Sequence, residues 1–293
     1  MFRASLRAMF PWVLTKDVKA VEVKVLSAYL EMFPRGDSSF VPTVFGWASD
    51  YFGGRYRDYQ AVDASYHDEE HTMQGTLCMV RLLRGRHHTG CEPPLTEHML
   101  QLGILAILLH DSGYLKKRDD TEGTGAKYTV THVSRSADFS AELLGDKGYN
   151  TTDIRAVQNM ILCTGINANL AAIPFQSELE RLVGYALGTG DLLGQMAAED
   201  YVEKLPVLFE EFAEAARYAQ DRKQSIPTFN SPTDLLQRTP AFWEDFVKPK
   251  LEKDFKGAYQ FLNKPYPSGA NEYVRHVEAN IDRLRKGLVA VLV

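Results

Sequence analysis

Residues 99–109 constrain the fold most strongly, because this stretch contains no charged residue and only one polar side chain, Gln101. An uncharged stretch of this length predicts a helix that is buried on nearly every side, and it is too short to span a bilayer. His110 and Asp111 follow it directly. A carboxylate at the end of a buried helix is costly unless it is paired. A divalent metal ion that binds His110 through nitrogen and Asp111 through oxygen would satisfy both side chains.

The composition is that of an ordinary globular protein, with 293 residues, 45% hydrophobic and 24% charged. The net charge of -5 gives no general attraction to nucleic acids or to anionic membranes, so we expect neither as a partner. Three cysteines, Cys78, Cys91 and Cys163, are too few for a disulfide framework and suit a reducing cytoplasm. We expect a soluble, cytoplasmic protein.

The first 14 residues are basic and apolar, like the start of a signal peptide. Pro11 interrupts this stretch, Lys16 and Asp17 end it, and no sustained apolar segment follows. We therefore expect no cleaved signal peptide.

The chain is predicted to be helical almost throughout, which makes the fold class all-α. Loops are expected over residues 35–63, 86–94 and 112–131, which are rich in glycine, proline or polar residues. Ser65 and Thr96 are expected to cap helices, Gly85 to end the first of these, and Ser177 with Glu180 to form a capping box. Further helices are expected over residues 17–33, 65–84, 132–144, 152–163, 198–222, 240–262 and 271–290.

His67 and His71 are four residues apart, so on a helix they would share one face, about 5–6 Å apart at Cβ. They flank an apolar stripe that includes Tyr66 and Met73, at the edge of the core, where metal sites of helical bundles lie. The alternative is that both histidines are surface residues at an acidic helix start.

Asp191 lies among small and apolar residues and has no salt-bridge partner nearby in the sequence. Taken alone, it could be a helix N-cap after Gly190, where Gly188 and Gly190 weaken the preceding helix. Together with His71, His110 and Asp111, it completes two imidazoles and two carboxylates around one ion. His132, at the start of a helix, could bind a second metal ion or a phosphate, or simply be an exposed or capping residue.

Three segments in this order resemble the HD-domain metal-dependent phosphohydrolases, with a pattern similar to members of the cyclic nucleotide phosphodiesterase type. They are Tyr66-His67-Asp68-Glu69-Glu70-His71, Leu108-Leu109-His110-Asp111-Ser112-Gly113-Tyr114 and Gly190-Asp191-Leu192-Leu193, in which Gly190 replaces an alanine. The resemblance covers about residues 60 to 215 and implies an HD-domain helical bundle. The second histidine motif of the HD-GYP branch and the purine-clamping glutamine region of eukaryotic phosphodiesterases are absent, so a cyclic nucleotide is not assigned as substrate.

The resemblance implies a role for each residue. His71, His110, Asp111 and Asp191 would hold the first metal ion, with Asp111 able to bridge to a second. His67 would be the general acid near the leaving group, and His132 would bind the second ion or the phosphate. Lys116, in the basic segment after the HD motif, could neutralise the substrate phosphate, although a solvated basic loop is an equally good interpretation.

The sequence therefore predicts an enzyme that hydrolyses a small phosphodiester or phosphomonoester, nucleotide-like in character, with one or two divalent ions (Mg, Mn, Fe, Zn, Co or Ni). The alternatives are a regulatory HD module that binds metal and nucleotide without turnover, or an iron-dependent HD-type oxygenase. We expect an N-terminal extension over residues 1–60, the metal-binding core over 61–222 and packed helices over 223–293. The sequence leaves open whether the chain forms a homodimer.

Overall fold

The computed structural model describes residues 14–219 and 228–291, and these residues form an all-helical fold without a β-strand, as predicted. The segment assessed for a signal peptide lies, up to residue 13, outside the described residues. Among the described residues no helix is both long and apolar enough to cross a membrane. The α-helices in chain order are α1 (Val18–Met32), α2 (Phe40–Phe52), α3 (Glu69–Thr89), α4 (Glu97–Leu109), α5 (His132–Asp146), α6 (Thr151–Ile161), α7 (Glu178–Met196), α8 (Tyr201–Tyr218), α9 (Pro232–Ala241) and α10 (Glu272–Val291).

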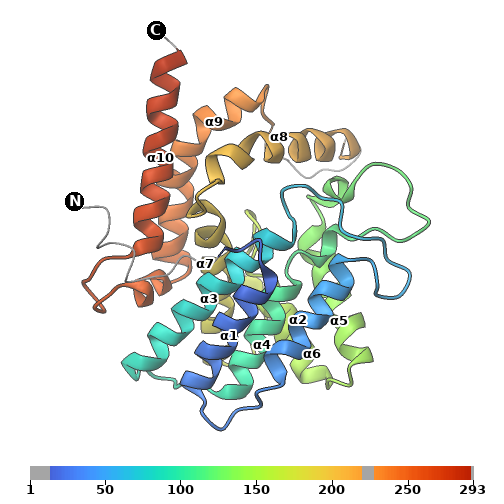
Figure 1. The fold of residues 1–293 in the computed structure, drawn as a ribbon, viewed down its shortest axis with the longest axis vertical. Helices are drawn as coiled ribbons and strands as arrows, with labels where there is room; N and C mark the ends of the chain where they lie inside the picture. Colours follow the sequence, from blue (N-terminus) through green and yellow to red (C-terminus); the bar gives the residue numbers. More distant parts are fainter. Residues whose placement is uncertain (1–13, 220–227, 292–293) are drawn as a thin grey trace.

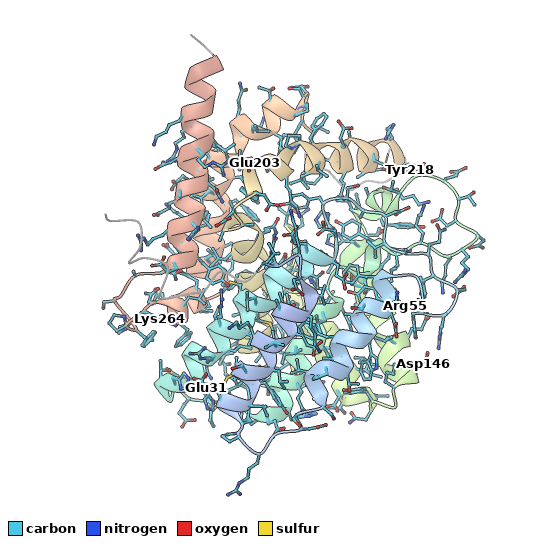
Figure 2. All side chains as sticks on the ribbon, in the orientation of Figure 1. Glu31, Arg55, Asp146, Glu203, Tyr218 and Lys264 are labelled. Carbon is cyan, nitrogen blue, oxygen red and sulfur yellow. The ribbon has the colours of Figure 1, made fainter. Side chains whose placement is uncertain are left out.

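Short 3-10 and π-helical segments connect several of these helices. They are η2 (Ser112–Tyr114), η3 (Gly125–Tyr128), η4 (Leu170–Ala172), η5 (Phe242–Val247), η6 (Lys250–Asp254) and η7 (Ala258–Leu262), of which η5 and η6 are π-helical. The C-terminal helices α8, α9 and α10 lie together at one side of the bundle formed by the earlier helices (Figure 1). Charged side chains such as Glu31, Arg55 and Asp146 lie at the outside of the molecule (Figure 2).

Helix α4 is the buried helix that the sequence predicts. The side chain of Thr96 accepts a hydrogen bond from the Met99 amide, at 3.2 Å, and so caps its first turn. Every residue from Leu102 to Leu109 is buried. The helix ends directly before His110, which places the His110-Asp111 pair inside the protein.

Residues 40–52 form α2, although the sequence predicts a loop over residues 35–63. Apolar side chains at helical spacing, among them Val41, Val44, Phe45 and Ala48, are buried and override the loop signals. Pro42 is tolerated because it lies in the first turn, where backbone amides have no partner within the helix.

Helix α3 begins and ends later than predicted. Its N-cap is Asp68, whose carboxylate accepts a hydrogen bond from the His71 amide at 2.8 Å, and not Ser65. Gly85 lies inside the helix, where a Cβ atom would be 2.0 Å from the carbonyl oxygen of Phe261. Gly85 therefore permits a close approach between two chain segments, and Gly90, with a left-handed backbone, ends the helix. As a result His87 and His88 lie in the last turn of α3 and not in a loop.

Helix α7 continues through Gly188, Gly190 and Asp191, where the sequence suggests a weakened helix. A Cβ atom on Gly190 would lie 2.8 Å from Cβ of Met79, and one on Gly194 would lie 2.7 Å from the carbonyl carbon of Gln74. The glycines thus allow α7 to pack closely against α3. Asp191 is in the middle of a helix, so the N-cap interpretation of this residue is wrong.

The C-terminal part also differs in detail from the prediction. Helix α8 runs through Pro206 without a break. The helix expected over residues 240–262 starts earlier, as α9, and continues through the wide turns of η5 and η6. Asn280 of α10 donates hydrogen bonds to the carbonyl oxygens of Met196 and Ala198, which ties α10 to the end of α7.

Candidate metal centre

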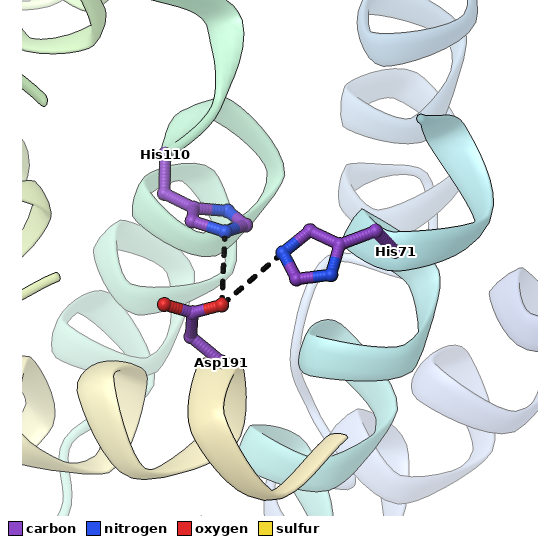
Figure 3. A group of neighbouring side chains, drawn as sticks. All are labelled: His71, His110 and Asp191. Atoms are coloured by element: carbon purple, nitrogen blue, oxygen red, sulfur yellow. Dashed lines mark ion pairs between the residues drawn. The ribbon is translucent and has the colours of Figure 1, made fainter. Parts of the chain in front are cut away.

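Four side chains that are far apart in the sequence meet in the interior. His71 comes from the first turn of α3, His110 and Asp111 from the end of α4, and Asp191 from the middle of α7. Figure 3 shows His71 and His110 pointing toward the carboxylate of Asp191 from two different helices. All four side chains are buried or nearly so.

The nitrogen and oxygen atoms of this cluster lie at distances that suit a shared ion. His71 Nε2 is 3.2 Å from Asp111 Oδ2 and 3.2 Å from Asp191 Oδ1. His110 Nε2 is 3.3 Å from Asp111 Oδ2 and 3.5 Å from Asp191 Oδ1. Ligand atoms about 2.1 Å from one ion are separated by about 3.0–3.4 Å at neighbouring tetrahedral or octahedral positions. The ligand atoms of His71, His110 and Asp191 all lie within 4.8 Å of one another, so these three side chains fit one ion, and Asp111 contacts both histidines from one side of this group.

The hydrogen bonding of His110 also supports a metal ion at this cluster. Its Nδ1 atom lies 2.8 Å from the carbonyl oxygen of Ile107, which accepts only if Nδ1 carries a proton. If the His110 ring is neutral, its Nε2 atom can only accept a hydrogen bond. Nε2 faces the carboxylates of Asp111 and Asp191, which also only accept, so no hydrogen bond can form between them. His110 Nε2 and Asp111 Oδ2 are both buried and make no hydrogen bond to any described residue. A cation between these atoms would satisfy both of them.

Without an ion, the two carboxylates favour protonated histidines. Burial opposes the charge on His71, but Asp111 and Asp191 outweigh it and raise its pKa to about 10. Burial likewise opposes the charge on His110, whose pKa the same carboxylates raise. The pKa of Asp191 is lowered, against the effect of burial, by His110 and His71. The site thus demands positive charge, which either protons or a metal ion can supply.

The second oxygen of Asp111 faces a different residue. His132 Nε2 lies 3.9 Å from Asp111 Oδ1, whereas Oδ2 faces His71 and His110. The His132 Nδ1 atom lies 2.6 Å from the carbonyl oxygen of Thr129, and burial lowers the pKa of the ring. A neutral His132 therefore directs a free Nε2 lone pair toward the side of Asp111 away from the first cluster.

His67 lies close to the cluster, but not for the reason given by the helical spacing. It precedes Asp68, the N-cap of α3, so it does not share a helical face with His71. Its Nδ1 atom is 2.6 Å from Oε2 of Glu211 on α8, a carboxylate that is almost fully buried. Glu211 also accepts a hydrogen bond from the Tyr66 amide, at 2.7 Å. A tertiary contact, and not a helix, positions His67.

Tyr114 contacts both histidines that flank the cluster. Its ring is stacked on His67, with centroids 4.5 Å apart, and on His132, with centroids 4.8 Å apart. The two histidine rings lie 6.1 Å apart at their centroids and are tilted by 35° relative to each other. The stack keeps His67 and His132 at fixed positions on one wall of the site.

The turn after Asp111 is held by the N-terminal part of α5. Ser136 Oγ accepts a hydrogen bond from the Gly113 amide at 2.8 Å, and Arg135 Nε donates to the Gly113 carbonyl oxygen at 2.7 Å. A Cβ atom on Gly113 would lie 2.0 Å from the carbonyl oxygen of His132, so only glycine fits there. This close approach brings His132 to Asp111.

Lys116 is placed apart from the cluster. Its ammonium forms an ion pair with Asp63 at 2.8 Å and donates to the Gly123 carbonyl oxygen at 2.6 Å. The side chain is buried and does not line the cavity described below. Lys116 therefore holds together the chain segments around Asp63 and Gly123. Unlike His67 and His132, it does not lie beside the cluster.

A cavity of about 1040 Å³ opens onto the cluster. His67, His71, Asp111, His132 and Asp191 line one part of it. The remaining wall is mostly apolar and includes residues from α8, α9, η5 and η6. The predicted core and the C-terminal helices therefore form the cavity together.

A family model described as Npun_R2479-like matches residues 23–265 of this helical protein. The match covers most of the chain, and the chain belongs to the Npun_R2479-like family. All residues of the cluster and its surroundings, from His67 to Glu211, fall within the matched span. Comparison with curated proteins found no match.

Sequence reasoning overlooked two residues that support the cluster. Glu211 lies within the stripe formed by Leu208, Phe212 and Ala215, and an acid at such a position is a signal of a buried partner. Gln195 donates to Asp191 Oδ1 at 3.3 Å and accepts from the Tyr66 hydroxyl at 2.8 Å. Its position one helical turn after Asp191 is a weak signal, because only the packing shows its partners.

Proposed function

We propose that this protein is a metal-dependent phosphohydrolase of the HD-domain type. The observation that carries the proposal is the meeting of His71, His110, Asp111 and Asp191, in which His110 Nε2 and Asp111 Oδ2 are buried and have no hydrogen-bond partner among the described residues. Two imidazoles and two carboxylates are a ligand set for borderline divalent ions such as Mn²⁺, Fe²⁺, Co²⁺, Ni²⁺ or Zn²⁺, and the carboxylates also suit Mg²⁺.

His71, His110, Asp111 and Asp191 would hold the ion, which when bound would lower the pKa of a water molecule and polarise a phosphoryl oxygen. The protein contributes the proton transfer. His67 lines the cavity beside the cluster, and Glu211 holds its Nδ1 atom, which leaves Nε2 to donate a proton to the departing oxygen. Glu211, which itself lies outside the cavity lining, is a positioning residue that orients the imidazole through its contact with Nδ1.

His132 could bind a second ion on the opposite side of Asp111. Because Asp111 directs one oxygen to each side, it can bridge between the first site and a site that includes His132. The proposal therefore includes one or two ions per chain. A small phosphoester is the proposed substrate, and no feature of the site selects between a phosphomonoester and a phosphodiester.

The direct test is hydrolysis of a panel of phosphomonoesters, phosphodiesters and nucleotides after reconstitution with Mg²⁺, Mn²⁺, Fe²⁺ or Co²⁺. Activity that appears with metal and disappears with a chelator is expected. The absence of metal-dependent hydrolysis across the panel would contradict the enzyme proposal and favour a regulatory module. Elemental analysis of the purified protein provides a second criterion: redox-inactive ions such as Mg²⁺ or Zn²⁺ would exclude the oxygenase alternative, whereas with iron only the hydrolysis assay discriminates between the two.

A further inference from the structure

Lys250 is a buried cation on the apolar wall of the cavity. It follows Pro249 at the start of η6, and its residue surface is 6% exposed. Both Lys250 and the aromatic side chains around it line the cavity that contains the metal cluster. Its near neighbours in the sequence, Val247 and Leu251, are buried apolar residues.

Lys250 has no hydrogen bond or ion pair among the described residues; burial lowers the pKa of its ammonium, and the carboxylates of Asp254 and Asp191 act on it only through longer-range electrostatics. Its Nζ atom lies 5.4 Å from the ring centroid of Phe246 and 5.5 Å from that of Phe255, which provides cation–π contacts only. The other strongly buried lysine, Lys116, is paired with Asp63. Burial disfavours the charged form of Lys250, so an anion that enters the cavity and contacts Nζ would favour the ammonium and bind to it.

The position of Lys250 relates it to the metal cluster. The ring of Phe255, which contacts Lys250, packs against α7 at Gly188, where a Cβ atom would lie 2.5 Å from Phe255 Cζ. Gly188 precedes Asp191 by three residues, which is about one helical turn, or about 5 Å along the axis. Lys250 and the cluster thus lie near the same part of α7 and face the same cavity.

Several phenylalanine rings line the cavity that Lys250 also lines, and two of them, Phe246 and Phe255, lie beside its ammonium. Phe242 and Phe246 are stacked with centroids 5.1 Å apart, and Phe212 and Phe229 lie 5.6 Å apart. All four line the cavity, as does Phe255. A flat apolar group fits such surroundings, because aromatic rings favour offset-stacked and edge-to-face contacts.

We propose that Lys250 is an anion-binding residue of this cavity, where it pairs with a phosphate oxygen of an aryl phosphoester whose ring packs among the phenylalanines. The inference rests on the proposed function only in taking the ligand to be a phosphoester. The binding step itself needs neither a metal ion nor turnover.

The test is calorimetric titration of the full-length protein with 1-naphthylphosphonate, which cannot be hydrolysed, in the presence of a chelator. We expect Lys250→Met to weaken binding at least about tenfold, because a charge-assisted hydrogen bond is lost. Lys250→Arg retains the charge and should retain most of the binding. Lys248→Met is the matched control, because Lys248 lies two residues away, pairs with Glu244 and does not line the cavity.

Two further measurements separate this role from a structural one. Binding of neutral 1-naphthol should be the same in the wild type and in Lys250→Met, and the melting temperature of Lys250→Met should rise because an unpaired buried charge is removed. Equal binding of the phosphonate by wild type and Lys250→Met overturns the proposal, as does no binding by the wild type. Lost binding with a lowered melting temperature assigns Lys250 to the fold and also overturns it. Failure of metal-dependent hydrolysis leaves these binding results intact, so the two proposals fail separately.

Discussion

Gly190 on α7 lies directly against Gly75 on α3, so closely that a Cβ atom on Gly190 would be 2.9 Å from the carbonyl oxygen of Gly75. Gly75 is one turn after His71, and Gly190 immediately precedes Asp191. This contact between two helices brings His71 Nε2 to within 3.2 Å of Asp191 Oδ1. The geometry of the candidate metal centre therefore depends on two residues that have no side chain.

We expect Gly190→Ala to disturb both stability and the metal centre. The added methyl group would be 2.8 Å from Cβ of Met79 as well as close to the backbone of Gly75, so α3 and α7 must separate. Overpacking of this kind costs about 1–3 kcal/mol in the free energy of unfolding. Urea unfolding measures the loss, and metal titration should show a lower affinity. Gly145→Ala is the control, because a Cβ atom on Gly145 would meet no atom within 4 Å, and it should leave metal affinity unchanged.

Replacement of either carboxylate should abolish stable metal binding. Asp111→Asn and Asp191→Asn each remove a negative charge and a ligand oxygen that lies 3.2 Å from His71 Nε2. The metal content after gel filtration, determined by elemental analysis, is the measurement. Asp58→Asn is the control, since Asp58 is exposed and pairs with Lys117. Full metal occupancy in Asp111→Asn would show that the ligand assignment is wrong.

His67 should contribute to turnover and not to metal retention. We expect His67→Gln to lower kcat by about 10²- to 10⁴-fold, the usual range for a general acid, with the metal content unchanged. Glu211→Gln should lower kcat less and shift its pH profile, because the carboxylate that holds His67 Nδ1 at 2.6 Å becomes neutral. Glu210→Gln changes the exposed neighbour on the same helix and should behave as the wild type. Unaltered kcat in His67→Gln would exclude His67 as the general acid.

The stability of the metal-free protein should depend on pH in a defined direction. The pKa of His71 rises from 6.5 to about 10 in the folded protein, because Asp111 and Asp191 outweigh the effect of burial. Protonated His71 therefore stabilises the fold fully below pH 6.5, and this contribution is lost as the pH rises toward 10. Asp191, whose pKa is lowered, contributes stability that is lost at acidic pH. Urea unfolding between pH 5 and 10 in a chelator should show the alkaline loss, and His71→Gln should flatten it.

The comparison of sequence with structure separates local from tertiary information. The apolar stretch of α4, its Thr96 cap and the pair that follows it are local features, and their prediction agrees with the structure. Helix α2 and the full length of α3 were not predicted, because proline and glycine signals suggested loops where packing stabilises helices. Gly188 and Gly190 are a similar case. In the sequence they suggest a weakened helix, but in the folded chain they allow α7 to pack closely against its neighbours.

By itself the sequence determined the all-α class and pointed to His71, His110, Asp111 and Asp191, because burying polar side chains at a helix end requires partners whatever the fold. Only the tertiary structure decided how those side chains face one another, and that Glu211, and not a helical repeat, positions His67. It also decided that Lys250 shares their cavity. These relationships join α3, α4, α7, α8 and η6, and local periodicity does not encode which helices meet, since that depends on the packing of the whole chain.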